Sequence, residues 1–175
     1  MEEITLVIDE DTLRRYEQHY FTLHPRAHKK PIAHPYHESI NTWMILKRAA
    51  MNALKQKWKD FGVWFIEDQG YTNLRIKRCE MTYEIYFPTH RRHDNDNYAP
   101  KFLQDSLVES GFVVDDDSEH ITKLTLCCGI DPERPRTEIH IRIEEKENEE
   151  HGTEKDSVRD DHGDPERPHG ENEHL

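Results

Sequence analysis

Apolar residues recur at every second position in two parts of the chain. In residues 77–87 the alternating positions are Cys79, Met81, Tyr83, Ile85 and Phe87. A period of two is typical of a half-buried strand, which Pro88 would end. Ile139, Ile141 and Ile143 predict a similar strand over residues 138–143, and two short apolar runs, residues 4–8 and 121–128, also have the length of strands.

A spacing of three and four residues takes over between these strands. Over residues 39–59, the apolar residues with this spacing are Ile40, Trp43, Met44, Met51, Leu54 and Trp58. This pattern predicts an amphipathic helix, with Ser39 as its N-cap. The polar stretch before it, which passes through Pro25, Pro31 and Pro35, is interpreted as a long loop.

A second helix is predicted over residues 98–110. Asn97 can cap it, Pro100 falls in its first turn, and Gly111 is a natural residue to follow its end. The order strand, helix, strand, helix, strand, strand predicts an α+β fold. We expect a single domain in which two helices cover a mixed or mostly antiparallel sheet.

The charge distribution separates this domain, residues 1–145, from an expected disordered acidic tail, residues 146–175. The last 32 residues hold 13 Asp and Glu against four Lys and Arg, and so account for nine of the twelve net negative charges. Such a segment cannot bury enough apolar surface to offset its chain entropy. The rest of the chain is nearly neutral, and its Lys and Arg gather between Arg26 and Lys101. A basic surface of this kind is the minimum that a DNA-binding protein needs.

The loop before the first predicted helix carries Lys29 and Lys30 beside four histidines. A zinc site is one interpretation, but a basic loop that contacts phosphate fits better, because no cysteine or helical His pair accompanies the histidines. The three cysteines, Cys79, Cys127 and Cys128, are odd in number and suggest buried thiols of a reducing compartment. With no apolar run of about 20 residues, we expect a cytoplasmic protein with no membrane partner.

Carboxylates dominate the segment after the strand predicted over residues 77–87. Asp94 and Asp96 are two residues apart, so in an extended chain both would point to one side. We expect the following helix to return the chain and bring residues 115–117, all Asp, near them. Carboxylates that close repel unless a divalent cation lies between them, and Mg²⁺ suits such ligands. The alternative is that both acidic segments are solvated turns.

The order of these motifs resembles the RusA-like family of Holliday-junction resolvases. The resemblance covers residues 75–143 and is carried by four elements in sequence: Arg91-Arg92, Asp94-x-Asp96-Asn97, Lys101, and Gly111-Phe112-x-x-Asp115-Asp116. It implies a crossover junction endodeoxyribonuclease that acts on branched DNA in recombination and repair. It also implies a homodimer, which would present its site twice to a two-fold DNA substrate.

The resemblance further implies roles for single residues. Asp94, Asp96 and Asp116 would be the catalytic carboxylates that bind Mg²⁺, or alternatively Mn²⁺, with Asp115 as a second-rank ligand. Lys101 would be a catalytic residue that contacts phosphate, and Asp105, four residues later on the same helix face, could hold it. We expect DNA backbone contacts from four basic residues: Arg91, Arg92, Lys29 and Lys30.

Two other functions remain open from the sequence. One is a catalytically silent DNA-binding relative that keeps the carboxylates but makes no cut. The other is a magnesium phosphohydrolase of small molecules, suggested by the pair His93-Asp94, although the further His and Asp that such a site needs are missing.

Overall fold

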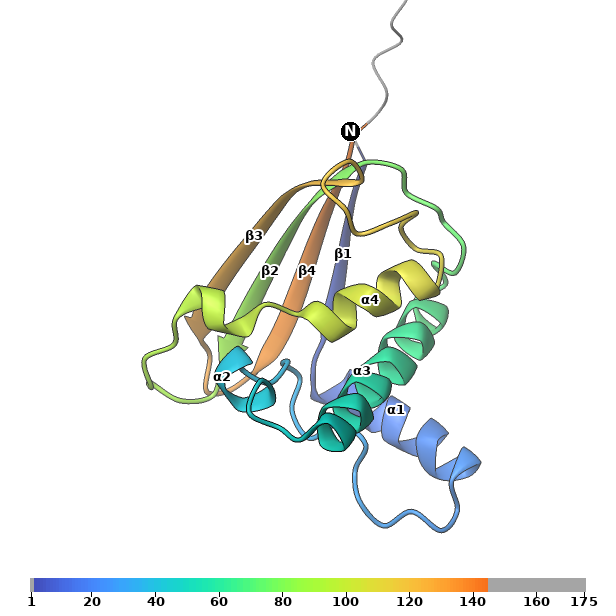
Figure 1. Cartoon of the computed structure of the whole chain (residues 1–175), viewed down its shortest axis with the longest axis vertical. Coiled ribbons are helices and arrows are strands. Elements are labelled where there is room, and N and C mark those ends of the chain that lie inside the picture. Colours follow the sequence, from blue (N-terminus) through green and yellow to red (C-terminus); the bar gives the residue numbers. More distant parts are fainter. Residues whose placement is uncertain (1, 145–175) are drawn as a thin grey trace, which may run out of the picture. The chain divides into compact units, whose positions relative to one another are not determined.

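The predicted alternation produces β2 (Cys79–Phe87), whose odd-numbered side chains are buried and whose even-numbered ones are half-buried. In the computed structural model, which describes residues 2–144, β2 belongs to a four-stranded sheet of order β1-β4-β2-β3 (Figure 1). β4 (Arg136–Ile143) pairs antiparallel with both β1 (Glu2–Ile8) and β2, while β3 (Ile121–Ile130) runs parallel to β2. The predicted α+β class and the mixed sheet are therefore confirmed.

Helices lie on one face of this sheet: in Figure 1, α4 (Lys101–Glu109) crosses in front of the strands, and α3 (Arg48–Asp68) lies below α4 on the side of β1. The core is the layer between them, and its largest fully buried side chains include Trp58, Tyr83, Phe61, Phe65 and Phe112. Two further α-helices, α1 (Glu10–Leu23) and α2 (Ile40–Trp43), and a 3₁₀ helix, η1 (Asn95–Tyr98), complete the described elements.

The prediction of a long loop before residue 39 is wrong for its first half, which forms α1. Asp9 caps this helix by accepting a hydrogen bond from the Thr12 backbone N at 3.0 Å. Tyr16 then packs edge-on against Phe61 of α3, with ring centroids 5.1 Å apart. Leu13, Tyr16 and Tyr20 recur at three and four residues and pack in or against the core, an apolar stripe that the sequence prediction overlooked.

The first predicted helix is broken into two. Ser39 does cap α2, accepting from the Thr42 backbone N at 3.3 Å, but the chain turns after Trp43 and Lys47 caps a new helix. This helix, α3, continues to Asp68, nine residues beyond the predicted end, since its second half supplies much of the core. It ends before Gly70, whose φ of 77° is left-handed.

The second predicted helix begins later than expected. Residues 95–98 form η1, and α4 starts at Lys101 with Pro100 as its N-cap. Gly111 follows its end with a φ of 70°, as predicted. The predicted cap Asn97 instead accepts a hydrogen bond from the Asn41 backbone N.

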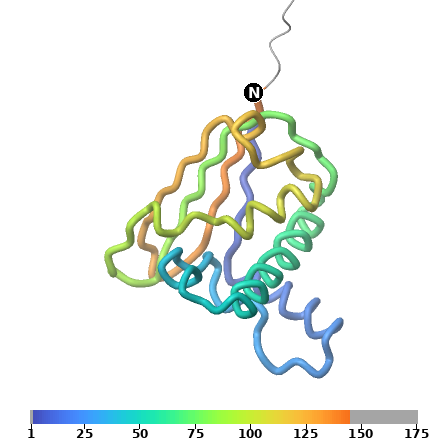
Figure 2. The backbone as a smooth tube through the Cα atoms, viewed as in Figure 1, coloured from blue at the N-terminus to red at the C-terminus, as the bar shows by residue number. Residues whose placement is uncertain are grey.

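The expected disordered tail, residues 146–175, lies outside the described residues. Figure 2 shows the path of the backbone, in which the chain enters β1 beside the point where it leaves β4, since Glu2 pairs with Ile143. Cys79 is a buried thiol as expected, whereas Cys127 and Cys128 on β3 are only half-buried because β3 is an edge strand. Within residues 2–144, none of the helices combines the length and apolar character that crossing a bilayer requires.

Candidate functional site

The chain segment between the parallel strands β2 and β3 contains the main candidate residues. After β2 ends at Phe87, this connection passes through η1 and α4 before β3 begins. Asp94 and Asp96 therefore lie just beyond the carboxyl end of β2. Sites outside the carboxyl ends of parallel strands are the usual ligand positions in sheets with helical crossovers.

Two asparagine side chains fix this segment to its neighbours. Asn95 Oδ1 accepts a hydrogen bond from the Cys128 backbone N of β3 at 3.0 Å. Asn97 Oδ1 accepts from the Asn41 backbone N of α2 at 3.3 Å. The two asparagines flank Asp96, so the backbone that carries this carboxylate is held from both sides.

Aromatic rings also pack against the segment that carries Asp94 and Asp96. The His93 ring stacks on Phe87, with centroids 3.7 Å apart and an interplanar angle of 7°. His93 Nδ1 also lies 3.1 Å from the Tyr98 hydroxyl oxygen. His93 and Tyr98 are thus both packed on Phe87 at the end of β2, and Asp94 and Asp96 lie between them in the chain.

Asp94 and Asp96 are both exposed, but the chain between them is not extended as expected. Asp94 has extended backbone angles, whereas Asp96 lies inside the 3₁₀ helix, where consecutive residues turn by about 120°. Asp94 Oδ1 lies 3.4 Å from Arg92 Nε, and both side chains are mostly in solvent. The prediction that an extended chain points Asp94 and Asp96 to the same side is therefore wrong. The two carboxylates nevertheless occupy one short segment, which is anchored by Asn95 and Asn97.

Lys101 opens α4 close to these carboxylates in the chain. Its side chain is 60% exposed, and its Nζ lies 4.0 Å from Asp105 Oδ1, which confirms the predicted pairing along the helix. Asp105 Oδ2 also lies 3.2 Å from Lys55 Nζ of α3. Asp105 thus pairs with one lysine of α3 and one of its own helix.

The expected convergence of Asp115 and Asp116 on Asp94 and Asp96 does not occur: among residues 2–144, these aspartates form no group of three whose ligand atoms lie within 4.8 Å of one another. Asp96 precedes α4 and Asp116 follows it, and the nine residues of that helix separate its ends by about 13 Å. The helix carries the chain across the sheet instead of returning it, as Figure 1 shows. Asp117 is engaged elsewhere: it accepts a hydrogen bond from the His120 ring at 2.7 Å, and this bond lowers the pKa of its carboxyl.

The four predicted DNA contacts are divided between two regions. Arg91 and Arg92 are exposed in the segment that leads to Asp94. Lys29 is exposed in the loop after α1, and Lys30 Nζ lies 3.0 Å from Glu17 Oε2 of that helix. Lys30 also lines a cavity of about 280 Å³, which is formed mainly by α1 and by the loop that follows it. None of the candidate aspartates lines this cavity.

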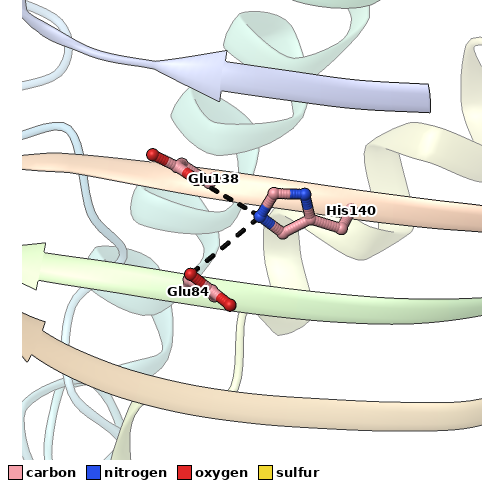
Figure 3. A group of neighbouring side chains, drawn as sticks. All are labelled: Glu84, Glu138 and His140. Carbon is pink, nitrogen blue, oxygen red and sulfur yellow. Dashed lines mark ion pairs between the residues drawn. The ribbon is translucent and has the colours of Figure 1, made fainter. Parts of the chain in front are cut away.

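A second group of potential ligands lies on the sheet face opposite the helices (Figure 3). Among residues 2–144, Glu84, Glu138 and His140 are the group of three whose ligand atoms lie within 4.8 Å of one another. His140 Nε2 is 3.2 Å from Glu138 Oε2 and 4.0 Å from Glu84 Oε2. The sequence prediction missed these residues, although the alternation of β2 and β4 already placed all three on the half-buried face.

Both carboxylates of this cluster already have hydrogen-bond donors. Arg136 Nε donates to Glu138 Oε1 at 2.5 Å, and the Tyr86 hydroxyl donates to Glu84 Oε2 at 2.7 Å. The Arg136 guanidinium also lies 3.9 Å above the Tyr86 ring. Two carboxylates and an imidazole are acceptable ligands for zinc or manganese, but here each carboxylate already accepts a hydrogen bond from a residue two positions away on its own strand. We interpret the cluster as a network of ion pairs that stabilises the sheet.

Comparison with known proteins adds no family to this description. Neither the protein-family models nor the curated proteins contain a match to this chain. The resemblance to RusA-like resolvases is thus carried by the motif residues alone, and of these the structure groups Arg92, Asp94, Asp96 and Lys101 around the start of α4.

Proposed function

We propose that the protein is a magnesium-dependent endodeoxyribonuclease that cuts branched DNA and acts as a homodimer. The observation that carries this proposal is the anchored segment after β2, which presents two exposed carboxylates between an arginine pair and Lys101. Carboxylates alone would repel a nucleic acid, and basic residues alone would only bind it. Their combination favours a site that holds a cation and a phosphodiester together.

Asp94 and Asp96 would hold the metal. Mg²⁺ is usually bound by one or two carboxylates together with water and phosphate oxygens, so two exposed aspartates are enough for such a site. When bound, Mg²⁺ would lower the pKa of a coordinated water and stabilise the charge that develops on phosphorus. Lys101 would contact a non-bridging phosphate oxygen, and Arg91 and Arg92 would hold the neighbouring backbone.

Asp116 has no place in this site within one chain. If it is a metal ligand, as the resemblance implies, it would have to come from the second copy of a homodimer. A test is available because Asp96→Asn and Asp116→Asn would then inactivate different halves of one composite site. Mixing the two inactive proteins would restore cleavage, whereas a site made by Asp94 and Asp96 alone would leave Asp116→Asn active.

The observations favour nucleic acid over a small-molecule substrate. The cavity beside α1 contains none of the candidate carboxylates, and Asp94 and Asp96 lie on an exposed surface rather than in an enclosed pocket. A silent DNA-binding relative would show the same exposed basic residues. Cleavage is the property that separates the two functions.

The deciding experiment compares a labelled four-way junction with a linear duplex of the same sequence, with Mg²⁺ and with EDTA. We expect cleavage of the junction only with Mg²⁺. Asp96→Asn should lower the cleavage rate at least 100-fold while junction binding is kept, and Glu3→Gln, which removes an exposed charge on β1, should change neither. A rate for Asp96→Asn within tenfold of the parent, or about 1.4 kcal/mol in barrier, would contradict the assignment of Asp96.

A further inference from the structure

Two large apolar side chains project into solvent at the corner between α2 and α3. Met44 is 65% exposed and Ile45 is 83% exposed. Isolated exposed apolar residues are common, but adjacent ones of this size favour contact with another molecule. The corner is therefore an apolar tip, defined here as Met44 and Ile45.

The corner is held in place by the residues beside the apolar tip. Trp43 turns inward and packs on Phe102, with ring centroids 5.1 Å apart. The Leu46 backbone N donates to the Trp43 carbonyl oxygen at 3.3 Å, which closes the turn. Trp43 thus takes the inward position at this corner, while Met44 and Ile45 remain exposed.

The same contacts attach the corner to the proposed nuclease site. Phe102 directly follows Lys101 in the first turn of α4. The Asn41 backbone N of α2 donates to Asn97, the residue after Asp96. The apolar tip is thus fixed to the segments that carry two of the proposed catalytic residues.

Basic residues follow the apolar tip along the chain. Residues 41–59 contain five basic residues and no acidic one: Lys47, Arg48, Lys55, Lys57 and Lys59. Lys55 and Lys59 pair with acidic residues of α4, whereas Lys47, Arg48 and Lys57 have no ion pair within residues 2–144. Lys47 and Arg48 directly follow the apolar tip, so an apolar contact there would be flanked by two free cations.

We propose that Met44 and Ile45 form a wedge that inserts between bases at the branch point of DNA, while Lys47 and Arg48 contact the flanking phosphates. This inference rests on the proposed function, because it names the feature of the substrate that the protein would recognise. Apolar side chains that enter a base step must unstack it, and the stack is already interrupted at a branch point. The wedge would therefore prefer a junction to a continuous duplex.

The charge pattern favours DNA over the two other surfaces that an apolar tip could meet. A membrane-bound amphipathic helix needs a free apolar face, but the apolar face of α3 is buried in the core through Trp58, Phe61 and Phe65. A contact between two copies would bring the unpaired Lys47 and Arg48 of both chains close together if it is symmetric. Phosphates on both sides of a branch point match these cations better.

The test uses the full chain in metal-free buffer, where binding can be measured without cleavage. The probe is a four-way junction with 2-aminopurine beside the branch point, compared with a linear duplex of matched sequence. The parent protein should increase the fluorescence of the junction by unstacking the probe. The double variant Met44→Ser/Ile45→Ser should lose this increase and at least tenfold of the preference for the junction, with duplex affinity within twofold of the parent.

Leu23→Ser is the matched control, because Leu23 is 63% exposed at the end of α1, away from the candidate segment. It should behave as the parent. The wedge is overturned if the double variant keeps the parent's fluorescence and preference, or if light scattering shows that it changes from a dimer to a monomer. A parent that unstacks the junction but never cuts it with Mg²⁺ supports the wedge and refutes the nuclease. If the parent cuts the junction with Mg²⁺ and the double variant keeps the parent's fluorescence and junction preference, the nuclease is supported and the wedge is refuted.

Discussion

Gly62 of α3 lies so close to Ser106 of α4 that a Cβ added to Gly62 would be 1.8 Å from Ser106 Oγ. Ser106 is fully buried, and its hydroxyl donates to the Leu103 carbonyl oxygen of its own helix. The missing side chain of Gly62 allows the two helices to cross at this point. The crossing also brings Lys55 of α3 to Asp105 of α4, beside the proposed catalytic lysine.

Gly62→Ala should therefore destabilise the protein by about 1–3 kcal/mol, because the helices must separate to admit the methyl group. Urea unfolding would measure the loss. Ser106→Gly removes the clashing atoms and should restore part of the stability in the double variant. Equal stability of Gly62→Ala and the parent would show that the helices do not pack as closely as described.

Tyr83→Phe should leave the protein as stable as the parent or more stable by about 1 kcal/mol. The Tyr83 hydroxyl is buried without a hydrogen-bond partner in the described part of the chain, and burial raises the pKa of its phenol. Tyr86→Phe is the contrasting variant, since the Tyr86 hydroxyl donates to Glu84 at 2.7 Å. Thermal unfolding of both variants checks the difference, and a lower melting temperature for Tyr83→Phe than for Tyr86→Phe would contradict it.

Acid should destabilise the fold partly through His37. Its ring is buried against Trp58 and Phe102, and its Nδ1–H donates to the Glu38 carbonyl oxygen at 2.8 Å, which leaves Nε2 as a buried acceptor without a partner. Burial lowers the pKa of His37 below its usual value of 6.5, and the Glu38 contacts oppose this only in part. Below about pH 6.5 the unfolded chain binds a proton at this residue that the folded protein does not, so stability falls as the pH decreases.

His37→Phe should flatten this decrease between pH 7 and pH 5, by at most about 1.4 kcal/mol per pH unit. Urea unfolding at several pH values would measure it. His34→Phe serves as the control because His34 is exposed, and it should keep the slope of the parent. The same slope in both variants would show that His37 takes up its proton without cost.

Asn95→Ala should reduce cleavage more than tenfold while lowering stability by only about 1 kcal/mol. The change removes the bond to Cys128 that fixes the carboxylate segment to β3. Asn95→Asp keeps an acceptor at this position and should retain more activity than Asn95→Ala. Parallel loss of activity and folding in both variants would instead indicate a purely structural role.

Mg²⁺ should bind at the segment after β2 and not at the cluster on the open sheet face. Glu138→Gln should keep the increase in melting temperature that Mg²⁺ produces, whereas Asp96→Asn should lose it. Differential scanning fluorimetry with increasing Mg²⁺ measures both. Loss of the increase in Glu138→Gln alone would transfer the metal site to Glu84, Glu138 and His140.

The sequence predicted the strands well because each buries one face, and a one-sided burial leaves a period of two that is visible in residues 79–87. It failed at the corner after α2, where Met44 continues the helical spacing although it points into solvent. Helical spacing of apolar residues predicts a continuous helix only if those residues are buried. Because the sequence does not show that Met44 is exposed, its spacing wrongly indicated that the helix continued through the corner.

The candidate site was predicted in part for a related reason. Motif order placed Asp94, Asp96 and Lys101 together, because they are close in the chain and the local turn keeps them so. The position of Asp116 depends on the direction in which α4 crosses the sheet, which is decided by packing at Gly62 and Ser106. No local pattern contains that information.

The pairing of Glu2 with Ile143 determines how the molecule can be attached to something else. Both residues lie at the end of the sheet where β2 begins, since Ile143 also pairs with Cys79. The nine residues of β2 then span roughly 30 Å before the chain reaches the proposed nuclease segment. A solid support or a fused protein joined at either end of the folded part would therefore be held at the end of the sheet opposite Asp94 and Asp96, and immobilised protein should leave these two residues open to long branched substrates.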